Sequence, residues 1–250
     1  MIQTHKRKRT MKKTNQNYQK RPRLPPIRNG ILKLPGSYVS KAKSEVKSCD
    51  VPPTATAFRS TAVPPQPVLM NIIQQGNGVN NRIGSIINMK SIHLRGVIDS
   101  TVTVTTQNQQ LRMMVIYDRN PNGNLPLFSD IISGRYPDNA NGSVIYSEIN
   151  IDNRERFVVL RDKYYTTPWQ QWNANTLVAT EVRDEQQFTV NEHIKMKGLS
   201  TIYNSTSNPI TSANINSGAV YLLLFMGSSQ LVQDGSWGLA WTARFRYTDA

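Results

Sequence analysis

Cysteine and histidine are scarce in this chain of 250 residues, which has one cysteine, Cys49, and three histidines, His5, His93 and His193. A single thiol excludes an intramolecular disulfide framework and a zinc site built on several thiolates. Three histidines scattered along the sequence leave few ligands for any other metal. We therefore expect no metal ion and no cofactor, and we interpret Cys49 as an incidental thiol.

Long apolar segments are also missing. The longest wholly apolar run is AVYLLLFM, residues 219–226, whereas a helix that crosses a membrane needs roughly twenty apolar residues. The basic N-terminus is not followed by the apolar stretch of a secretory signal. We expect a chain that is neither secreted nor inserted into a membrane.

Acidic residues are absent from residues 1–44, which contain 13 of the 30 lysines and arginines. The net charge of the chain is +14, so nearly all of it lies in this segment. Because large apolar residues are rare here, the segment predicts a disordered arm. Uninterrupted positive charge favours a polyanionic partner, whose phosphates are contacted without reading the bases. The predicted nucleic-acid-binding residues of the arm are Lys6, Arg7, Lys8, Arg9, Lys12, Lys13, Lys20, Arg21, Arg23, Arg28, Lys33, Lys41 and Lys43.

Two basic clusters within the arm resemble a bipartite nuclear-import signal. The first lies in the segment HKRKRTMKK, and the second follows after a short spacer. We therefore expect nuclear import receptors as partners, which can read these residues before nucleic acid binds them. The predicted import residues are Lys6, Arg7, Lys8, Arg9, Lys12, Lys13, Lys20, Arg21 and Arg23.

Proline is concentrated in residues 22–67, which hold nine of the 14 prolines. Proline lacks the backbone donor that a helix interior or a central strand requires. We expect a Pro-rich linker over residues 45–67, between the arm, residues 1–44, and a folded domain, residues 68–250.

From about residue 68 onward, apolar and polar residues alternate with a period of two, and there is no long helical pattern. Continuous apolar runs at residues 111–117 and 219–226 predict strands in the middle of a sandwich. The predicted fold class is all-β, a single eight-stranded jelly-roll β-sandwich, with an Ig-like or lectin-like sandwich as the alternative. The expected strands cover residues 86–98, 111–117, 157–165, 176–182, 188–196, 199–203, 219–226 and 237–247.

Alternation along WTARFRY, residues 241–247, places the aromatic side chains on one face of a strand and Arg244 and Arg246 on the other. These arginines are the predicted phosphate contacts of the folded domain. The alternative is that they form ion pairs between subunits. The same alternation places His93 and His193 on the polar faces of their strands.

No catalytic constellation of useful specificity is present, and we expect no enzymatic activity. Asp152, Glu155 and Asp162 interleave with basic residues, which is typical of a salt-bridged surface strand rather than of an acid and base pair. For His93 and His193, an exposed or hydrogen-bonded role is the simpler interpretation.

Two tryptophans, Trp169 and Trp172, lie in YYTTPWQQWNAN outside the clear alternation. They fit a loop cap, a contact between subunits or a surface on which single-stranded bases stack. Trp241, in contrast, lies on a core face, where packing is sufficient explanation.

Several ordered blocks of the sequence resemble the coat proteins of small circular single-stranded DNA viruses, the geminivirus-like and related CRESS-DNA groups. The blocks are VIYDRNPNG, NRERFVVLRDKYYTT, KSIHLRG, LLLFMGS and WTARFRYTD, and the resemblance covers about residues 76–250. It implies a jelly-roll subunit, an icosahedral shell, encapsidation of single-stranded DNA and passage through the host nucleus. Some plant-infecting members have finger-like cysteines and histidines near the basic region. This chain has Cys49 alone, so a zinc-dependent DNA contact is not expected.

Together, the residues and the resemblance predict a viral capsid protein that self-assembles in about sixty or more copies and packages a circular single-stranded DNA genome through its arm. Expected partners are this DNA, further copies of the chain, nuclear import receptors and a host cell or vector receptor of unknown identity. Expected locations are the virion and the host nucleus. The alternative is a monomeric nucleic-acid-binding protein with a β-domain and a basic tail. A lectin-like protein would leave the arm unexplained.

Overall fold

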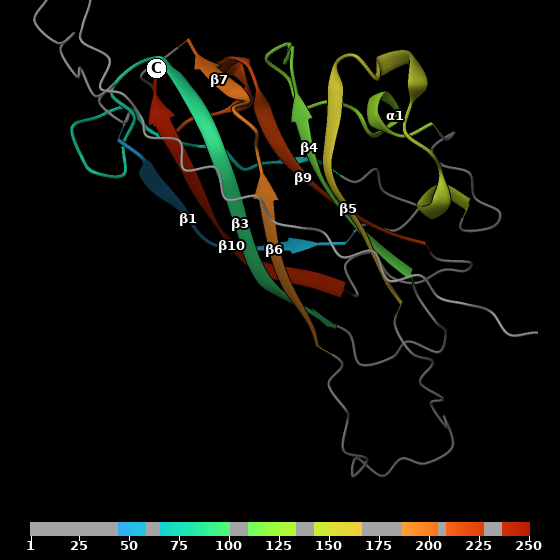
Figure 1. Ribbon diagram of the computed structural model, residues 1–250. Helices are drawn as coiled ribbons and strands as arrows, with labels where there is room; N and C mark the ends of the chain where they lie inside the picture. The colour runs from blue at the N-terminus through green and yellow to red at the C-terminus, as the bar shows by residue number, and fades with distance from the viewer. Residues whose placement is uncertain are drawn as a thin grey trace, which may run out of the picture. The chain divides into compact units, whose positions relative to one another are not determined.

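The computed structural model describes residues 45–58, 66–100, 110–133, 143–166, 187–204, 209–227 and 237–250 (Figure 1). The chain divides into two units, Met1–Lys43 and Ser44–Ala250, and all described residues belong to the second. The arm, the expected strand 176–182, Trp169 and Trp172 lie outside the described residues.

Two antiparallel sheets make up the folded unit. Sheet A has the order β1-β10-β3-β7-β8, and β6 also pairs with β3. Its strands are β1 (Lys47–Ala57), β3 (Ile86–Ser100), β6 (Phe188–Lys195), β7 (Ser200–Tyr203), β8 (Ile215–Ser217) and β10 (Trp237–Asp249). Sheet B has the order β2-β9-β4-β5, with β2 (Val68–Leu69), β4 (Gln110–Asp118), β5 (Phe157–Thr166) and β9 (Ala219–Gly227). The connections contain α1 (Phe128–Ile131) and the 3-10 helices η1 (Ser143–Tyr146), η2 (Ile151–Asn153) and η3 (Ser212–Asn214).

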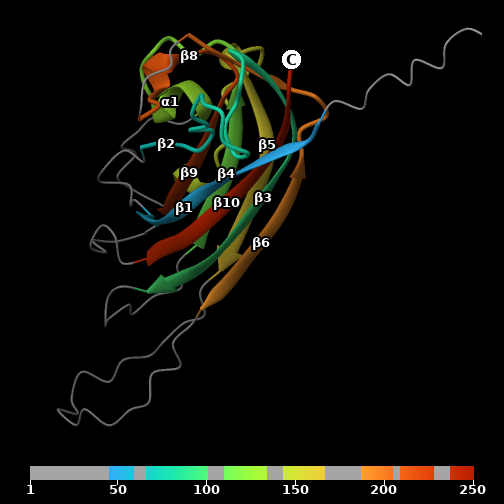
Figure 2. The same cartoon turned by 90° about the vertical axis from the view of Figure 1, so that its left-hand side faces the viewer.

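Eight of the described strands form nested antiparallel pairs. β4 pairs with β5, β3 with β6, β2 with β9 and β1 with β10. Nested pairs divided between two sheets are the jelly-roll arrangement. In Figure 2, β1, β10, β3 and β6 lie side by side as one layer. The predicted fold class is therefore confirmed, and β7 and β8 extend one end of sheet A.

Strand β1 corrects the predicted linker over residues 45–67. It contains Pro52 and Pro53 and nevertheless pairs with β10 along most of its length. The register shifts between Val51 and Thr54, so the prolines occupy an irregularity in the ladder. β1 is also the edge strand of sheet A among the described strands, a position that tolerates proline. Proline does exclude a central strand, but it does not exclude this edge strand.

Seven of the predicted strands correspond to β3, β4, β5, β6, β7, β9 and β10. Besides β1, the prediction missed β2 and β8, which have two and three residues. Strands this short cannot display a period-two pattern, so the sequence contains no alternation that would reveal them.

The inner strands of sheet B, β4 and β9, are buried on both of their faces. Val115 and Leu222 belong to the core between the two sheets, whereas Met114 and Leu223 pack on the opposite side against a second cluster that includes Phe128 of α1. Burial on both faces explains why residues 111–117 and 219–226 are continuous apolar runs. Sheet A differs, because buried and exposed residues alternate along β6 and β10. The outward side of these two strands is therefore exposed.

Candidate nucleic-acid interface

The outward side of sheet A contains the phosphate contacts predicted for the folded domain. Along β10, Trp241 and Phe245 are buried, whereas Arg244 and Arg246 are exposed, as the alternation predicts. We call this surface the outer A face. Its residues on β1, β10, β3 and β6 are Ser48, Asp50, Ala55, Ala240, Thr242, Arg244, Arg246, Ser91, His93, Arg95, Val97, Thr189, Asn191, His193 and Lys195.

The first row of the outer A face is basic. The strand register makes Lys195 on β6, Ser91 on β3 and Arg246 on β10 successive neighbours. Neighbouring strands are about 4.8 Å apart, so the two cations flank Ser91. Ser91 is buried beneath them, with 7% of its surface exposed. A phosphate group above this row would meet a lysine and an arginine together.

The second row combines two histidines with an ion pair. His193, His93 and Arg244 are successive neighbours, and Arg244 in turn pairs with Asp50 of β1. The imidazole rings are 6.0 Å apart between centroids and meet edge to face at 66°. Each histidine was predicted to lie on a polar face. Their contact with each other could not be predicted, because the sequence of one strand does not reveal which residues of another strand lie opposite it.

Arg244 is bound within its own chain. Its Nε and Nη2 donate to Asp50 Oδ1 and Oδ2 at 2.6 and 2.7 Å. The hydrogen bonds from Arg244 lower the pKa of Asp50 from its ordinary value. The alternative prediction for Arg244 was an ion pair between subunits, but its partner in the structure belongs to the same chain. A phosphate that approaches Arg244 must therefore compete with Asp50.

The third row is centred on Arg95, which lies between Asn191 on β6 and Thr242 on β10. Its Nε lies 3.2 Å from His93 Nε2, and Asn191 Oδ1 lies 2.8 Å from the same nitrogen. Arg95 is exposed. Arg95 is not among the predicted site residues, although its outward position in KSIHLRG is a signal that could have identified it.

Next to Arg95 the surface is hollow. Residues of all four strands, among them Ala55, Val97, Thr189 and Ala240, line an open depression of about 610 Å³. Gly96 of β3 lines it too, and a Cβ atom added there would lie 2.5 Å from the Ala240 carbonyl oxygen. Small side chains and a required glycine thus create an apolar depression beside a basic row.

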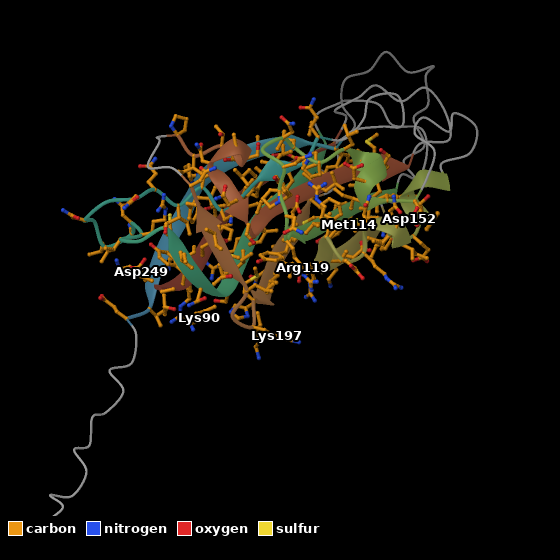
Figure 3. The ribbon with its side chains drawn as sticks, turned by 90° about the horizontal axis from the view of Figure 1, so that it is seen from above. Lys90, Met114, Arg119, Asp152, Lys197 and Asp249 are labelled. Atoms are coloured by element: carbon orange, nitrogen blue, oxygen red, sulfur yellow. The ribbon has the colours of Figure 1, made fainter. Side chains whose placement is uncertain are left out.

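Cations exceed acids on and beside the outer A face. Lys90, Arg95, Lys195 and Arg246 form no salt bridge with any residue in the described ranges. Figure 3 shows Lys90 together with Lys197, from the turn after β6, along one side of the folded unit. Uncompensated Lys and Arg side chains are the groups that contact nucleic-acid phosphates.

The mixed charges around β5 have a structural role. Asp162 pairs with Arg112, Arg156 with Asp118, and Arg161 and Lys163 with Glu192. Arg112, Asp118 and Glu192 are buried and come from other strands. In the described part of the chain, the predicted ion pairing is therefore found for Asp162 alone among the three acids, and its partner lies on another strand rather than on the surface of the same one. Asp152 and Glu155 are exposed and form no salt bridge with a described residue.

The other residues considered from the sequence, Trp241 and Cys49, lie at least partly in the interior. Trp241 is buried in the core and its Nε1 donates to Thr56 Oγ1 at 3.0 Å. Cys49 is half-buried, and this burial raises its thiol pKa. Within the described ranges no three metal-binding side chains gather at one point. No helix in the described part of the chain has the length and apolarity to cross a membrane.

Eight nested strands in two antiparallel sheets define the folded unit as a jelly-roll sandwich, a class that includes virus shell proteins. Over residues 3–233 the chain matches the Geminivirus coat protein/nuclear export factor BR1 family. This match spans nearly the whole chain, so the chain belongs to that family and is a geminivirus-like viral coat protein, a structural component of the virion. No curated protein matches the chain. The resemblance inferred from the sequence blocks is confirmed.

Proposed function

We propose that this coat protein assembles into a closed icosahedral shell and packages circular single-stranded DNA through its basic arm, residues 1–44. The observation that carries the proposal is the separation of charge. The arm has 13 basic residues and no acid, and it lies largely within the match to the coat protein family. Phosphate neutralisation of this kind is strong, salt-dependent and indifferent to base sequence.

The amount of charge suits a packaging role. In the smallest icosahedral shell of about sixty subunits, the arms would supply on the order of 780 positive charges. That number offsets a large part of the backbone charge of a genome of a few kilobases. Repulsion between arms would oppose assembly until DNA is present, so DNA uptake and shell closure would be coupled.

We infer that the outer A face lies on the DNA side of the shell wall. On this face Lys195 and Arg246 form no salt bridge with an acid in the described part of the chain. The outward side of sheet B, in contrast, is covered by α1 and its neighbours. Arg246 then contacts phosphate directly, and Arg244 does so in competition with Asp50.

The same arm would direct the protein to the host nucleus. The two clusters from Lys6 to Lys13 and from Lys20 to Arg23 are separated as in a bipartite import signal. We propose no catalytic activity, in keeping with the structural role of the family.

Negative-stain electron microscopy and multi-angle light scattering on the full chain test the proposal, with and without single-stranded DNA and at low and high salt. The expected result is uniform closed particles in the presence of DNA. A chain without residues 1–44 should form empty shells and take up no DNA. A persistent species of 28.3 kDa that coats DNA would instead favour the monomeric alternative.

A further inference from the structure

His93 Nε2 is approached by two groups that make opposite demands on it. Arg95 Nε–H points to it at 3.2 Å, which requires a lone pair on the histidine nitrogen. Asn191 Oδ1 lies 2.8 Å away, and an amide oxygen requires a proton on that nitrogen. Nε2 can accept from Arg95 or donate to Asn191 Oδ1 but cannot do both, so the protonation of His93 decides which of these two hydrogen bonds forms.

The two states differ in what they do to Arg95. When His93 is neutral with its proton on Nδ1, Nε2 accepts from Arg95, and the Asn191 amide must turn its NH₂ group toward the ring. When His93 is an imidazolium, both nitrogens donate, and Nε2 donates to Asn191 Oδ1. Arg95 then loses its acceptor and faces a second positive charge, so its guanidinium is released from the face.

The groups around His93 favour the binding of an anion. His193 faces it at 6.0 Å between ring centroids, so acid places two imidazolium groups side by side. The acid in the same row, Asp50, is already held by Arg244 through two hydrogen bonds. The other charged groups around the pair are Lys90 and Arg95 on β3, Lys195 on β6 and Arg246 on β10, all of them positive.

We propose that His93, His193 and Arg95 form a binding site for a backbone phosphate of single-stranded DNA, and that protonation of the two histidines strengthens this site. The inference rests on the proposed function, because the phosphate is that of the packaged DNA. Acid supplies two charges and frees the Arg95 guanidinium, and the phosphate relieves the repulsion among them. Binding and protonation therefore favour each other.

Among the side-chain types of the outer A face, only histidine ordinarily changes its charge in mild acid. Histidine gains its proton between about pH 8 and pH 5, whereas Lys and Arg stay charged throughout. The pKa of Asp50 is lowered by Arg244, so this carboxylate also remains ionised across the interval. The arm contributes a nearly constant background apart from His5.

The test is the affinity of the full chain for oligothymidylate without a terminal phosphate, measured by fluorescence anisotropy. Light scattering should first establish a protein concentration at which no particles form. Wild-type protein is expected to bind several-fold, about fivefold or more, tighter at about pH 5.5 than at about pH 7.5. The double variant His93→Gln/His193→Gln should lose this dependence, and Arg95→Gln should weaken binding more at the lower pH.

Matched controls separate this site from general charge effects. His5→Gln should keep the pH dependence, and Arg154→Gln, an exposed arginine after η2, should leave it unchanged. Circular dichroism confirms that each variant is folded. If the double variant keeps the wild-type dependence, or wild-type affinity is equal at both pH values, the inference is overturned while the proposed function stands. If wild-type protein binds no DNA at either pH, the proposed function itself fails.

Discussion

Arg112 of β4 binds Asp162 of β5 through two parallel hydrogen bonds, Nε to Oδ1 at 2.9 Å and Nη2 to Oδ2 at 2.7 Å. Its Nη1 donates to the carbonyl oxygens of Ile145 and Ser147, both at 2.8 Å. The Tyr164 ring lies 4.8 Å from the guanidinium carbon. Only 3% of the Arg112 side chain is exposed. This arginine therefore ties the η1 segment to the outward side of sheet B.

Replacing Asp162 by alanine should leave Arg112 as a buried cation without its carboxylate. Removal of one partner of a buried ion pair costs about 3 kcal/mol. Urea unfolding should show a loss of this size, whereas Asp152→Ala, at an exposed acid, should change stability little. The double variant Arg112→Met/Asp162→Leu should recover part of the loss, because two apolar side chains leave no buried charge although the Ile145 and Ser147 carbonyl oxygens lose their donor. A single-variant cost no larger than that of Asp152→Ala would contradict this role.

Tyr221→Phe should stabilise the protein at neutral pH. The Tyr221 hydroxyl is buried and finds no hydrogen-bond partner among the described residues. Removing a buried, unsatisfied hydroxyl is expected to raise the free energy of unfolding by about 1 kcal/mol. Thermal and urea unfolding measure the difference, and a clear destabilisation would show that the hydroxyl has a partner.

The same tyrosine predicts a loss of stability in alkali. Burial raises the pKa of Tyr221 to about 12, above the ordinary value near 10 of an unfolded chain. The unfolded state therefore loses its proton first, so the free energy of unfolding does not depend on this group below about pH 10 and falls between about pH 10 and pH 12. Across this interval the free energy of unfolding of Tyr221→Phe should fall by on the order of 2 kcal/mol less than that of the wild type. If the free energy of unfolding of the two proteins falls equally with pH over this interval, Tyr221 is not the group responsible.

Gly96→Ala should destabilise sheet A at the apolar depression. The added Cβ would lie 2.5 Å from the Ala240 carbonyl oxygen and 3.0 Å from Trp241 Cβ, so the backbone must move. We expect a cost of about 2 kcal/mol, typical of overpacking. Gly84→Ala is the control, because its nearest neighbour would lie at 3.8 Å. Equal unfolding free energies for the two variants would mean that sheet A tolerates the methyl group.

Asp50→Ala should strengthen DNA binding by freeing Arg244. The variant removes both hydrogen bonds that hold the guanidinium, which can then contact a phosphate. One added phosphate contact steepens the dependence of log K on log salt by about 0.7 for single strands. The slope, measured for full-length protein, should return to the wild-type value in Asp50→Ala/Arg244→Gln. Asp99→Ala removes an acid of β3 without freeing Arg244, so an equal steepening there would refute the mechanism.

The alternation of β6 and β10 was sufficient to predict which of their residues are buried and which are exposed. His193 is exposed on β6, as predicted, and the alternate residues Val190 and Ile194 are buried. The same pattern does not identify partners across strands. Asp162 finds its partner Arg112 at a distance of 50 residues along the chain, and Glu192, in an inward position of β6, binds Arg161 of β5. Such contacts depend on register and on the distance between the sheets.

The candidate site was predictable only in part for the same reason. Arg244 and Arg246 follow from a single strand, whereas the contact of His93 with His193 requires the pairing of β3 with β6. The sequence also did not predict what covers the outward side of sheet B. A continuous apolar run indicates burial, but it does not distinguish a second sheet from a short helix such as α1.

Pro52 and Pro53 at the edge of sheet A have a consequence for contacts between copies of this chain. An edge strand with free backbone groups invites the same strand of another molecule to add to the sheet, and repeated addition produces open ribbons. Two residues without N–H donors, placed at a shift in the ladder, interrupt that template. Growth of the sheet from one copy of this chain to the next is thereby discouraged along this edge, so a contact made here falls to side chains rather than to a continuous backbone ladder.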